Sequence, residues 1–119
     1  MLALSVLVNV AAALPAQARG TSPTEDPGIP AVSLAQLPVE ARQTLALIRK
    51  GGPFPHQRDG ITFGNYERAL PLRSRGYYQE YTVGTPGLTH RGARRIVAGR
   101  SGEFYYTDDH YRTFKRIRE

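Results

Sequence analysis

Three groups of residues in this sequence have the types and spacing that acid–base chemistry needs. Glu80 lies in the middle of the run YYQEYTV, whose aromatic and β-branched residues are typical of a β-strand. The run THRGARRI brings Arg91, Arg94 and Arg95 within five residues, and guanidinium groups bind phosphate oxygens through paired N–H donors. The turn DDHY contains His110, and an ordinary histidine pKa of about 6.5 suits proton transfer near neutral pH.

Each group also has a simpler structural explanation. Glu80 fits a charged side chain on a half-exposed strand, the arginines fit a solvated basic edge strand, and His110 fits an incidental surface histidine. Other chemistries have less support, because the chain has no cysteine and its three histidines lack a metal-binding spacing such as H-E-x-x-H. Neither a P-loop nor a G-x-S-x-G motif occurs.

One helix is expected before the residues that could do chemistry. Pro38 suits a first helical turn, Glu40 follows it there, and Lys50 is followed by Gly51-Gly52-Pro53, which ends a helix. Residues at helical spacing predict its buried face: Ala41, Thr44, Leu45 and Ile48.

The rest of the chain is expected to form strands. Five runs separated by turn residues have strand character: GITFGNYE (60–67), YYQEYTVG (77–84), RRIVAG (94–99), EFYYTDD (103–109) and RTFKRIR (112–118). One helix followed by four or five consecutive strands, with no second helix for crossovers, predicts an α+β domain with an antiparallel sheet.

Alternation along the strands assigns the two faces of this sheet. Tyr81, Val83, Ile96 and Ala98 are expected to pack against the helix. Glu80 and Arg95 then project from the opposite, solvent-accessible face. The active site is expected on that face, with His110 in a nearby turn.

Composition and the N-terminal segment indicate a secreted basic protein. The first eighteen residues carry no charge and end in AQA, which predicts a signal peptide cleaved before Arg19. A transmembrane anchor is the alternative, but Asn9 and Pro15 interrupt the run, and it is shorter than the ~20 apolar residues that span a bilayer. Residues 19–31 predict a flexible arm and residues 32–119 the folded domain. A net charge of +6 and a pI near 10.1 favour a polyanionic partner: nucleic acid, anionic membrane or acidic polysaccharide.

A strand-borne carboxylate, a group of arginines and a histidine on a basic domain together predict metal-free cleavage of RNA. RNA supplies its own nucleophile, the 2′-hydroxyl. The protein need only remove that proton, stabilise the charge on the phosphate and protonate the leaving 5′-oxygen.

Four segments extend this hypothesis to a family: GPFPHQRDGITFGNYE, YYQEYTV, TPGLTHRGARRIVAG and YYTDDHYRTF. In this order, from about Val32 to Ile117, they resemble the small secreted guanyl-preferring bacterial ribonucleases, the barnase-like group. The resemblance implies a 2′,3′-cyclic phosphate as the first product, a 3′-phosphate as the second, and no cofactor. The roles that it implies are a general base, a general acid, two phosphate-binding arginines and an aromatic residue at the phosphate and base site: Glu80, His110, Arg91, Arg95 and Tyr111.

The resemblance also implies a guanine-reading loop, in which the Glu67 carboxylate accepts the N1–H and N2–H donors of the base. Phe63 is expected both to anchor the loop and to pack in the core, and Asn65 to tolerate unusual backbone angles. The sequence departs from the family at two positions: Gly64 stands where a polar residue is common, and Tyr66 where several members have arginine. An aromatic ring at position 66 can still stack on a base.

The partners follow from the same resemblance. Single-stranded RNA is the expected substrate of a monomeric, extracellular enzyme with no stable membrane association. A barstar-like inhibitor is an expected partner, although the arginine missing at Tyr66 is expected to weaken its binding. Two other functions stay open: a secreted basic nucleic-acid-binding or membrane-active protein without catalysis, and a glycosidase that uses Glu67 and Glu80 as its carboxylate pair.

Overall fold

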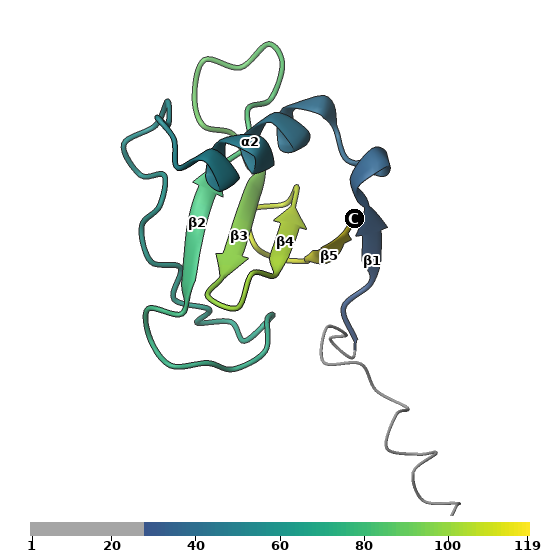
Figure 1. The fold of residues 1–119 in the computed structure, drawn as a ribbon, viewed down its shortest axis with the longest axis vertical. Coiled ribbons are helices and arrows are strands. Elements are labelled where there is room, and N and C mark those ends of the chain that lie inside the picture. Colours follow the sequence, from purple (N-terminus) through teal and green to yellow (C-terminus); the bar gives the residue numbers. More distant parts are fainter. Residues whose placement is uncertain (1–27) are drawn as a thin grey trace, which may run out of the picture.

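A computed structural model describes residues 28–119 of the chain. Within these residues, one α-helix packs across one face of a five-stranded sheet whose strand order is β1-β5-β4-β3-β2 (Figure 1). The elements are β1 (Ala31–Ser33), a 3-10 turn η2 (Leu34–Gln36), α2 (Val39–Lys50), β2 (Tyr78–Thr82), β3 (Arg95–Gly99), β4 (Phe104–Thr107) and β5 (Lys115–Arg118). The α+β class predicted from the sequence is confirmed. No helix in residues 28–119 is long and apolar enough to cross a membrane.

The helix α2 has the boundaries that its terminal residues dictate. Pro38 is the N-cap, with extended backbone angles, one residue before the position expected from the sequence. Gly51 ends the helix in the left-handed region, at φ 90°, and its N–H donates to the Leu47 carbonyl over 2.9 Å. The predicted buried face is confirmed for Ala41, Thr44 and Leu45, whereas Ile48 is partly buried and packs against the edge of the core.

The main core lies between α2 and the sheet. Val83, which follows β2, and Ile96 of β3 are fully buried there, which confirms the predicted helix-facing position of these two residues. The Thr44 hydroxyl donates to the Thr82 carbonyl over 3.2 Å and ties the helix to the sheet. The buried residues of this core are Leu37, Ala41, Leu45, Val83, Ile96, Tyr106 and Ile117.

The sheet is mixed, which corrects the expectation of a purely antiparallel sheet. Strands β2, β3, β4 and β5 pair antiparallel in chain order, as predicted. β1 adds to the far edge in parallel with β5, with Val32 opposite Ile117. A strand of three residues is too short to show alternation, so β1 cannot be predicted from periodicity. Ala31, the last residue of the predicted arm, starts this strand, whereas residues 1–27, with the predicted signal peptide, lie outside the described residues.

The strand expected over residues 60–67 does not form. Thr62 makes only an isolated bridge with Gln79, although the Gly60 N–H donates to the Glu80 carbonyl over 2.7 Å and the Phe63 N–H to the Tyr78 carbonyl over 2.9 Å. The segment therefore follows the edge of β2 for a few residues. It leaves that edge just before Asn65, whose φ is 54°, because a left-handed residue cannot continue a strand.

A second core covers the face of the sheet that was expected to be open to solvent. Five buried residues form it: Leu70, Tyr78, Val97, Tyr105 and Phe114. Phe63 and Ala69, which precede β2 in the chain, pack against this cluster. Glu80 and Arg95 do lie on this face, but they are only 7% and 2% exposed, so the prediction of a solvent-accessible position is wrong for both.

Candidate active site

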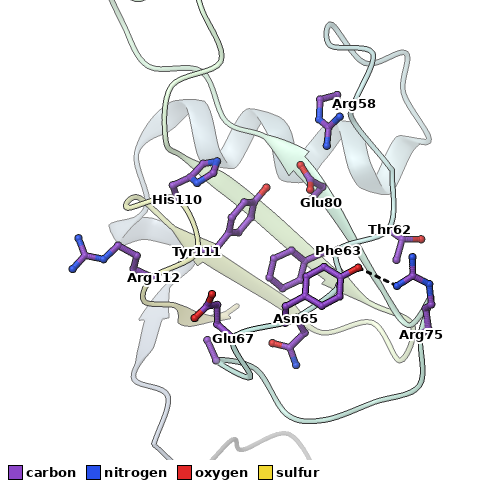
Figure 2. A pocket seen from close by; sticks show the side chains of 13 residues that line it. Arg58, Thr62, Phe63, Asn65, Glu67, Arg75, Glu80, His110, Tyr111 and Arg112 are labelled. Carbon is purple, nitrogen blue, oxygen red and sulfur yellow. Dashed lines mark hydrogen bonds between the residues drawn. The ribbon is translucent and has the colours of Figure 1, made fainter.

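A cleft of about 780 Å³ opens beside this second core (Figure 2). Its lining includes eight of the ten residues that the sequence singled out, all except Arg91 and Arg95. These eight are Phe63, Gly64, Asn65, Tyr66, Glu67, Glu80, His110 and Tyr111. Residues separated by almost 50 positions therefore meet in one concave site.

Glu80 is the carboxylate at the centre of this site. β2 places it opposite Val97 of β3, on the face away from α2. Its Oε1 atom accepts a hydrogen bond from Arg91 Nη2 over 3.1 Å and lies 4.0 Å from Arg95 Nε. The two cations compensate a buried negative charge that would otherwise be costly.

Arg91 and Arg95 are held beside Glu80 and do not line the cleft. Arg91 Nε donates to the Thr82 hydroxyl over 3.0 Å, so this guanidinium bridges two residues of β2. Arg95 Nη1 donates to the carbonyls of Gly92 and Arg94 over 3.0 and 2.8 Å. The two guanidinium groups therefore meet at Glu80, and four of their six nitrogen atoms already donate to the protein itself.

Tyr111 connects the two halves of the site. Its hydroxyl accepts a hydrogen bond from Arg95 Nε over 3.1 Å, and its ring lies 4.8 Å from that of Phe63. Burial, followed by a hydrogen bond to Glu80, raises the pKa of Tyr111 to about 12. The phenol is therefore protonated at neutral pH.

His110 lies at the exposed end of the cleft, in the turn that follows β4. Figure 2 shows His110 and Glu80 on either side of Tyr111. His110 and Tyr111 both have positive φ, 57° and 75°, conformations that a turn must hold against their intrinsic cost. The His110 N–H donates to the Ala93 carbonyl over 3.0 Å, which joins this turn to the arginine segment.

Asp109 holds the turn in this shape. Its carboxylate accepts hydrogen bonds from the N–H of Thr113 over 2.9 Å, the hydroxyl of Thr113 over 2.6 Å and the hydroxyl of Thr107 over 2.8 Å. These bonds, with Thr113 the largest cause, lower the pKa of Asp109 to about 2. The adjacent histidine is thereby presented to the cleft from a fixed backbone.

The predicted base-reading loop forms the other side of the cleft. Asn65 closes it: its side chain donates to the Leu70 carbonyl over 2.9 Å and accepts from the Leu70 N–H over 3.0 Å. Its positive φ confirms the expected tolerance of unusual backbone angles. Phe63 packs against the second core, as expected, and also lines the cleft. Glu67 lines the cleft and is exposed.

Five residues that line the cleft were missed by the sequence analysis: Arg58, Thr62, Ala69, Arg75 and Arg112. All come from irregular segments or bends, where no periodicity predicts which way a side chain points. Three of them are arginines, and in a chain with sixteen lysines and arginines no single one stands out. In the described part of the chain, His, Cys, Asp and Glu side chains form no cluster of three that could hold a metal ion.

The α+β fold, together with a carboxylate, arginines and a histidine around one cleft, places the protein in the class of small acid–base nucleases. A family model described as ribonuclease matches residues 19–118. The chain therefore belongs to the ribonuclease family, and the resemblance inferred from its sequence is confirmed.

Relatives and solved structures support the same assignment. Guanyl-specific ribonuclease St of Saccharopolyspora erythraea is 53% identical over 74% of this chain and 87% of its own. Guanyl-specific ribonuclease Sa of Kitasatospora aureofaciens is 55% identical over 72% of this chain and 91% of its own. Ribonuclease Sa2, in a structure with bound mononucleotides, is 50% identical in sequence to this chain. The match covers 79% of this chain and 98% of the Sa2 chain, with a TM-score of 0.77. Ribonuclease Sa2 has also been solved with guanosine-2′-cyclophosphate, in a structure that is 49% identical.

Proposed function

We propose that this protein is an endoribonuclease that cleaves single-stranded RNA after guanosine and needs no metal ion or cofactor. The observation that carries the proposal is that Glu80, which is paired with Arg91 and Arg95, lines the same cleft as His110. Relatives named guanyl-specific ribonucleases, with about half of their residues identical, support the choice of substrate.

In the first step the 2′-hydroxyl of the guanosine attacks the adjacent phosphorus. The Glu80 carboxylate takes the hydroxyl proton, and a P–O bond forms from the 2′-oxygen. His110, in its protonated form, donates a proton to the 5′-oxygen as its bond to phosphorus breaks. The products are a 2′,3′-cyclic phosphate and a new 5′-hydroxyl end.

In the second step water opens the cyclic phosphate. His110, now neutral, accepts a proton from the water, and Glu80, now protonated, returns its proton to the 2′-oxygen. The product is a 3′-phosphate, and both side chains regain their starting states. The guanidinium groups of Arg91 and Arg95 offset the negative charge that builds on the phosphate in both steps.

Guanine selection is assigned to the loop 63–67. Glu67 is exposed in the cleft, without an ion pair among the described residues, so its carboxylate can accept both N1–H and N2–H of a guanine. Adenine lacks this donor pair, and a site built for hydrogen bonds discriminates strongly against a ligand that lacks them. The rings of Phe63 and Tyr66 supply apolar surface for the base.

Replacement of the general base tests this proposal. In EDTA, the wild-type protein is expected to cleave the dinucleoside monophosphate GpU, whereas Glu80→Gln should lose at least a hundredfold in kcat because the amide cannot accept the proton. Glu40→Gln is the matched control, since Glu40 pairs with Arg94 outside the cleft. If Glu80→Gln binds RNA and cleaves GpU as the wild type does, Glu80 is not the base. If the wild type leaves GpU intact, the protein acts only by binding.

We also infer that the enzyme is exported and works outside the cell. The uncharged first eighteen residues and their AQA end support this, and N-terminal sequencing of protein recovered from a culture medium should find Arg19 first. Monomeric behaviour and binding of a barstar-like inhibitor are two further predictions. Light scattering, alone and with a candidate inhibitor, would test both.

A further inference from the structure

Tyr66 is an aromatic side chain that no hydrophobic core holds in place. It is 80% exposed, the highest value among the exposed large hydrophobic residues of the described chain. An exposed aromatic side chain without contacts samples several rotamers. A ligand that binds to its ring must fix one of them, which costs conformational entropy. The structure nevertheless fixes this ring at the cleft from two sides.

Gly64 makes room for the ring on one side. A Cβ atom at position 64 would lie 2.5 Å from the Cε2 and Cζ atoms of Tyr66, closer than side-chain contacts allow. The φ of Gly64 does not fall in the left-handed region, so space rather than backbone conformation is what glycine provides here. The glycine that departs from the family pattern therefore accommodates the tyrosine that also departs from it.

Arg75 holds the ring from the other side. Its Nη1 atom donates a hydrogen bond to the Tyr66 hydroxyl over 3.2 Å, the bond dashed in Figure 2. Arg75 comes from the segment that precedes β2, nine residues further along the chain, and both side chains line the cleft. None of the ion pairs among residues 28–119 involves Arg75. The hydrogen bond to Tyr66 is also the largest cause of the raised pKa of Arg75.

We propose that Arg75 is a positioning residue of the base site, which holds the Tyr66 ring at the cleft as a stacking surface for the bound guanine. The inference rests on the proposed function, because it assigns the base site to the loop 63–67. Arg75 then acts through Tyr66 rather than by touching the reacting phosphate. Loss of Arg75 should therefore weaken binding of the base and leave the chemical step unchanged.

A double-mutant cycle tests this arrangement. Arg75→Gln and Tyr66→Phe each remove the hydrogen bond, and Tyr66→Phe keeps the ring. Each is expected to raise KM for GpU and Kd for guanosine 3′-monophosphate about threefold to tenfold, with kcat unchanged, since stacking contributes a large share of binding at such sites. The double variant should be no worse than either single one, because both remove the same interaction.

Two more variants test the position of the Tyr66 ring, one through its hydrogen bond and one through the space beside it. Arg75→Lys keeps a donor near the Tyr66 hydroxyl and should recover part of the lost affinity. Gly64→Ala leaves the charge of the cleft unchanged but puts a methyl group where the ring lies, so it should raise KM as Arg75→Gln does. Competition by inorganic phosphate should be the same for all variants, which a phosphate-binding role of Arg75 would not allow.

Arg73→Gln is the matched control. Arg73 lies two residues away on the same segment, over the Tyr77 ring at 5.4 Å, and does not line the cleft. If Arg75→Gln behaves as Arg73→Gln does, or if the losses in the double variant add up, the positioning role is overturned while the proposed function stands. If the wild type neither binds guanosine 3′-monophosphate nor cleaves GpU, the proposed function itself fails, and the positioning role fails with it.

Discussion

Tyr111 links the acid–base chemistry of the site to its base-binding surface. Its hydroxyl accepts a hydrogen bond from Arg95, while its ring packs against that of Phe63. With a pKa of about 12 the phenol keeps its proton at neutral pH. One side chain therefore helps to hold Arg95 beside the proposed base and forms part of the wall of the cleft.

Tyr111→Phe removes the hydrogen bond from Arg95 and keeps the ring. We expect kcat/KM for GpU to fall about tenfold, since one hydrogen bond to a charged group contributes about 1.5 kcal/mol. Tyr77→Phe is the control, because the Tyr77 hydroxyl donates to Glu103 over 2.7 Å and does not line the cleft. Equal kinetics for the two variants would show that the hydroxyl of Tyr111 has no part in catalysis.

Asp109 is the residue whose ionisation should be visible in the stability of the fold. Its pKa is lowered to about 2 in the folded protein, from an ordinary value near 3.9. Its contribution to the free energy of unfolding is therefore complete above pH ~4 and is lost as the pH falls through about 2. Asp109→Asn should lower Tm by a few degrees at pH 7 and flatten the loss of stability between pH 4 and pH 2. Thermal unfolding at several pH values gives Tm for both proteins. If Tm of the wild type and of Asp109→Asn falls by the same amount between pH 4 and pH 2, Asp109 does not stabilise the fold in this way.

The segment between β2 and β3 depends on one buried arginine. The Arg95 guanidinium, whose side chain is 3% exposed, donates to the carbonyls of Gly92 and Arg94, and its Nε atom donates to Tyr111. The segment therefore folds back onto the start of the strand that it precedes. At the scale of elements, Arg95 connects β3, this segment and the turn after β4.

Arg95→Ala should therefore be a stability variant as well as a catalytic one. We expect the free energy of unfolding to fall by about 3 kcal/mol, because two partly buried carbonyls lose their donor and the buried Glu80 carboxylate keeps only Arg91 as a cationic partner. Arg94→Ala is the matched control, as Arg94 makes a partly exposed pair with Glu40 at 3.7 Å that contributes at most about 1 kcal/mol. Urea unfolding that gives the two variants the same stability would remove this role from Arg95.

The parts of the fold with strong periodicity were predictable from the sequence, and the parts made by loops were not. Apolar spacing in α2 and alternation in β2 and β3 identified the helix, its buried face and the strand that carries Glu80. β1 is not predictable because three residues show no pattern, and the segment 60–67 has the composition of a strand although Asn65, with its positive φ, turns it away from β2.

The candidate site divides in the same way. Eight of the ten residues named from the sequence line the cleft, since a family resemblance carries information about positions in loops. Arg75 was not foreseen, because its role depends on a contact with Tyr66 that no local pattern encodes. The burial of Glu80 was not foreseen either, because it depends on a second core built from distant segments.

At the scale of the whole molecule, part of the positive charge is carried by arginine side chains that line the cleft. Besides Arg75, which is hydrogen-bonded to Tyr66, two arginines line it, Arg58 and Arg112, against the carboxylates of Glu67 and Glu80. Glu80 is already compensated by Arg91 and Arg95. With the net charge of +6, this arrangement attracts a polyanion to the cleft.

Cleavage of long RNA should therefore depend on salt more strongly than cleavage of GpU. The logarithm of kcat/KM for a polynucleotide is expected to fall with the logarithm of salt concentration by about 0.7 for each phosphate that the protein neutralises. GpU has only the scissile phosphate, so its slope should be the smaller of the two. Equal slopes for both substrates would mean that the charge outside the catalytic centre does not contact RNA.

Product mapping on an oligoribonucleotide with a single internal guanosine, incubated in EDTA, tests the central claim most directly. The proposed mechanism predicts one cut, on the 3′ side of the guanosine, with a 2′,3′-cyclic phosphate that appears first and a 3′-phosphate that replaces it. Cuts at every nucleotide would contradict the assignment of the base site to the loop 63–67. An intact oligonucleotide, or products that end in a 5′-phosphate, would contradict the roles of Glu80 and His110.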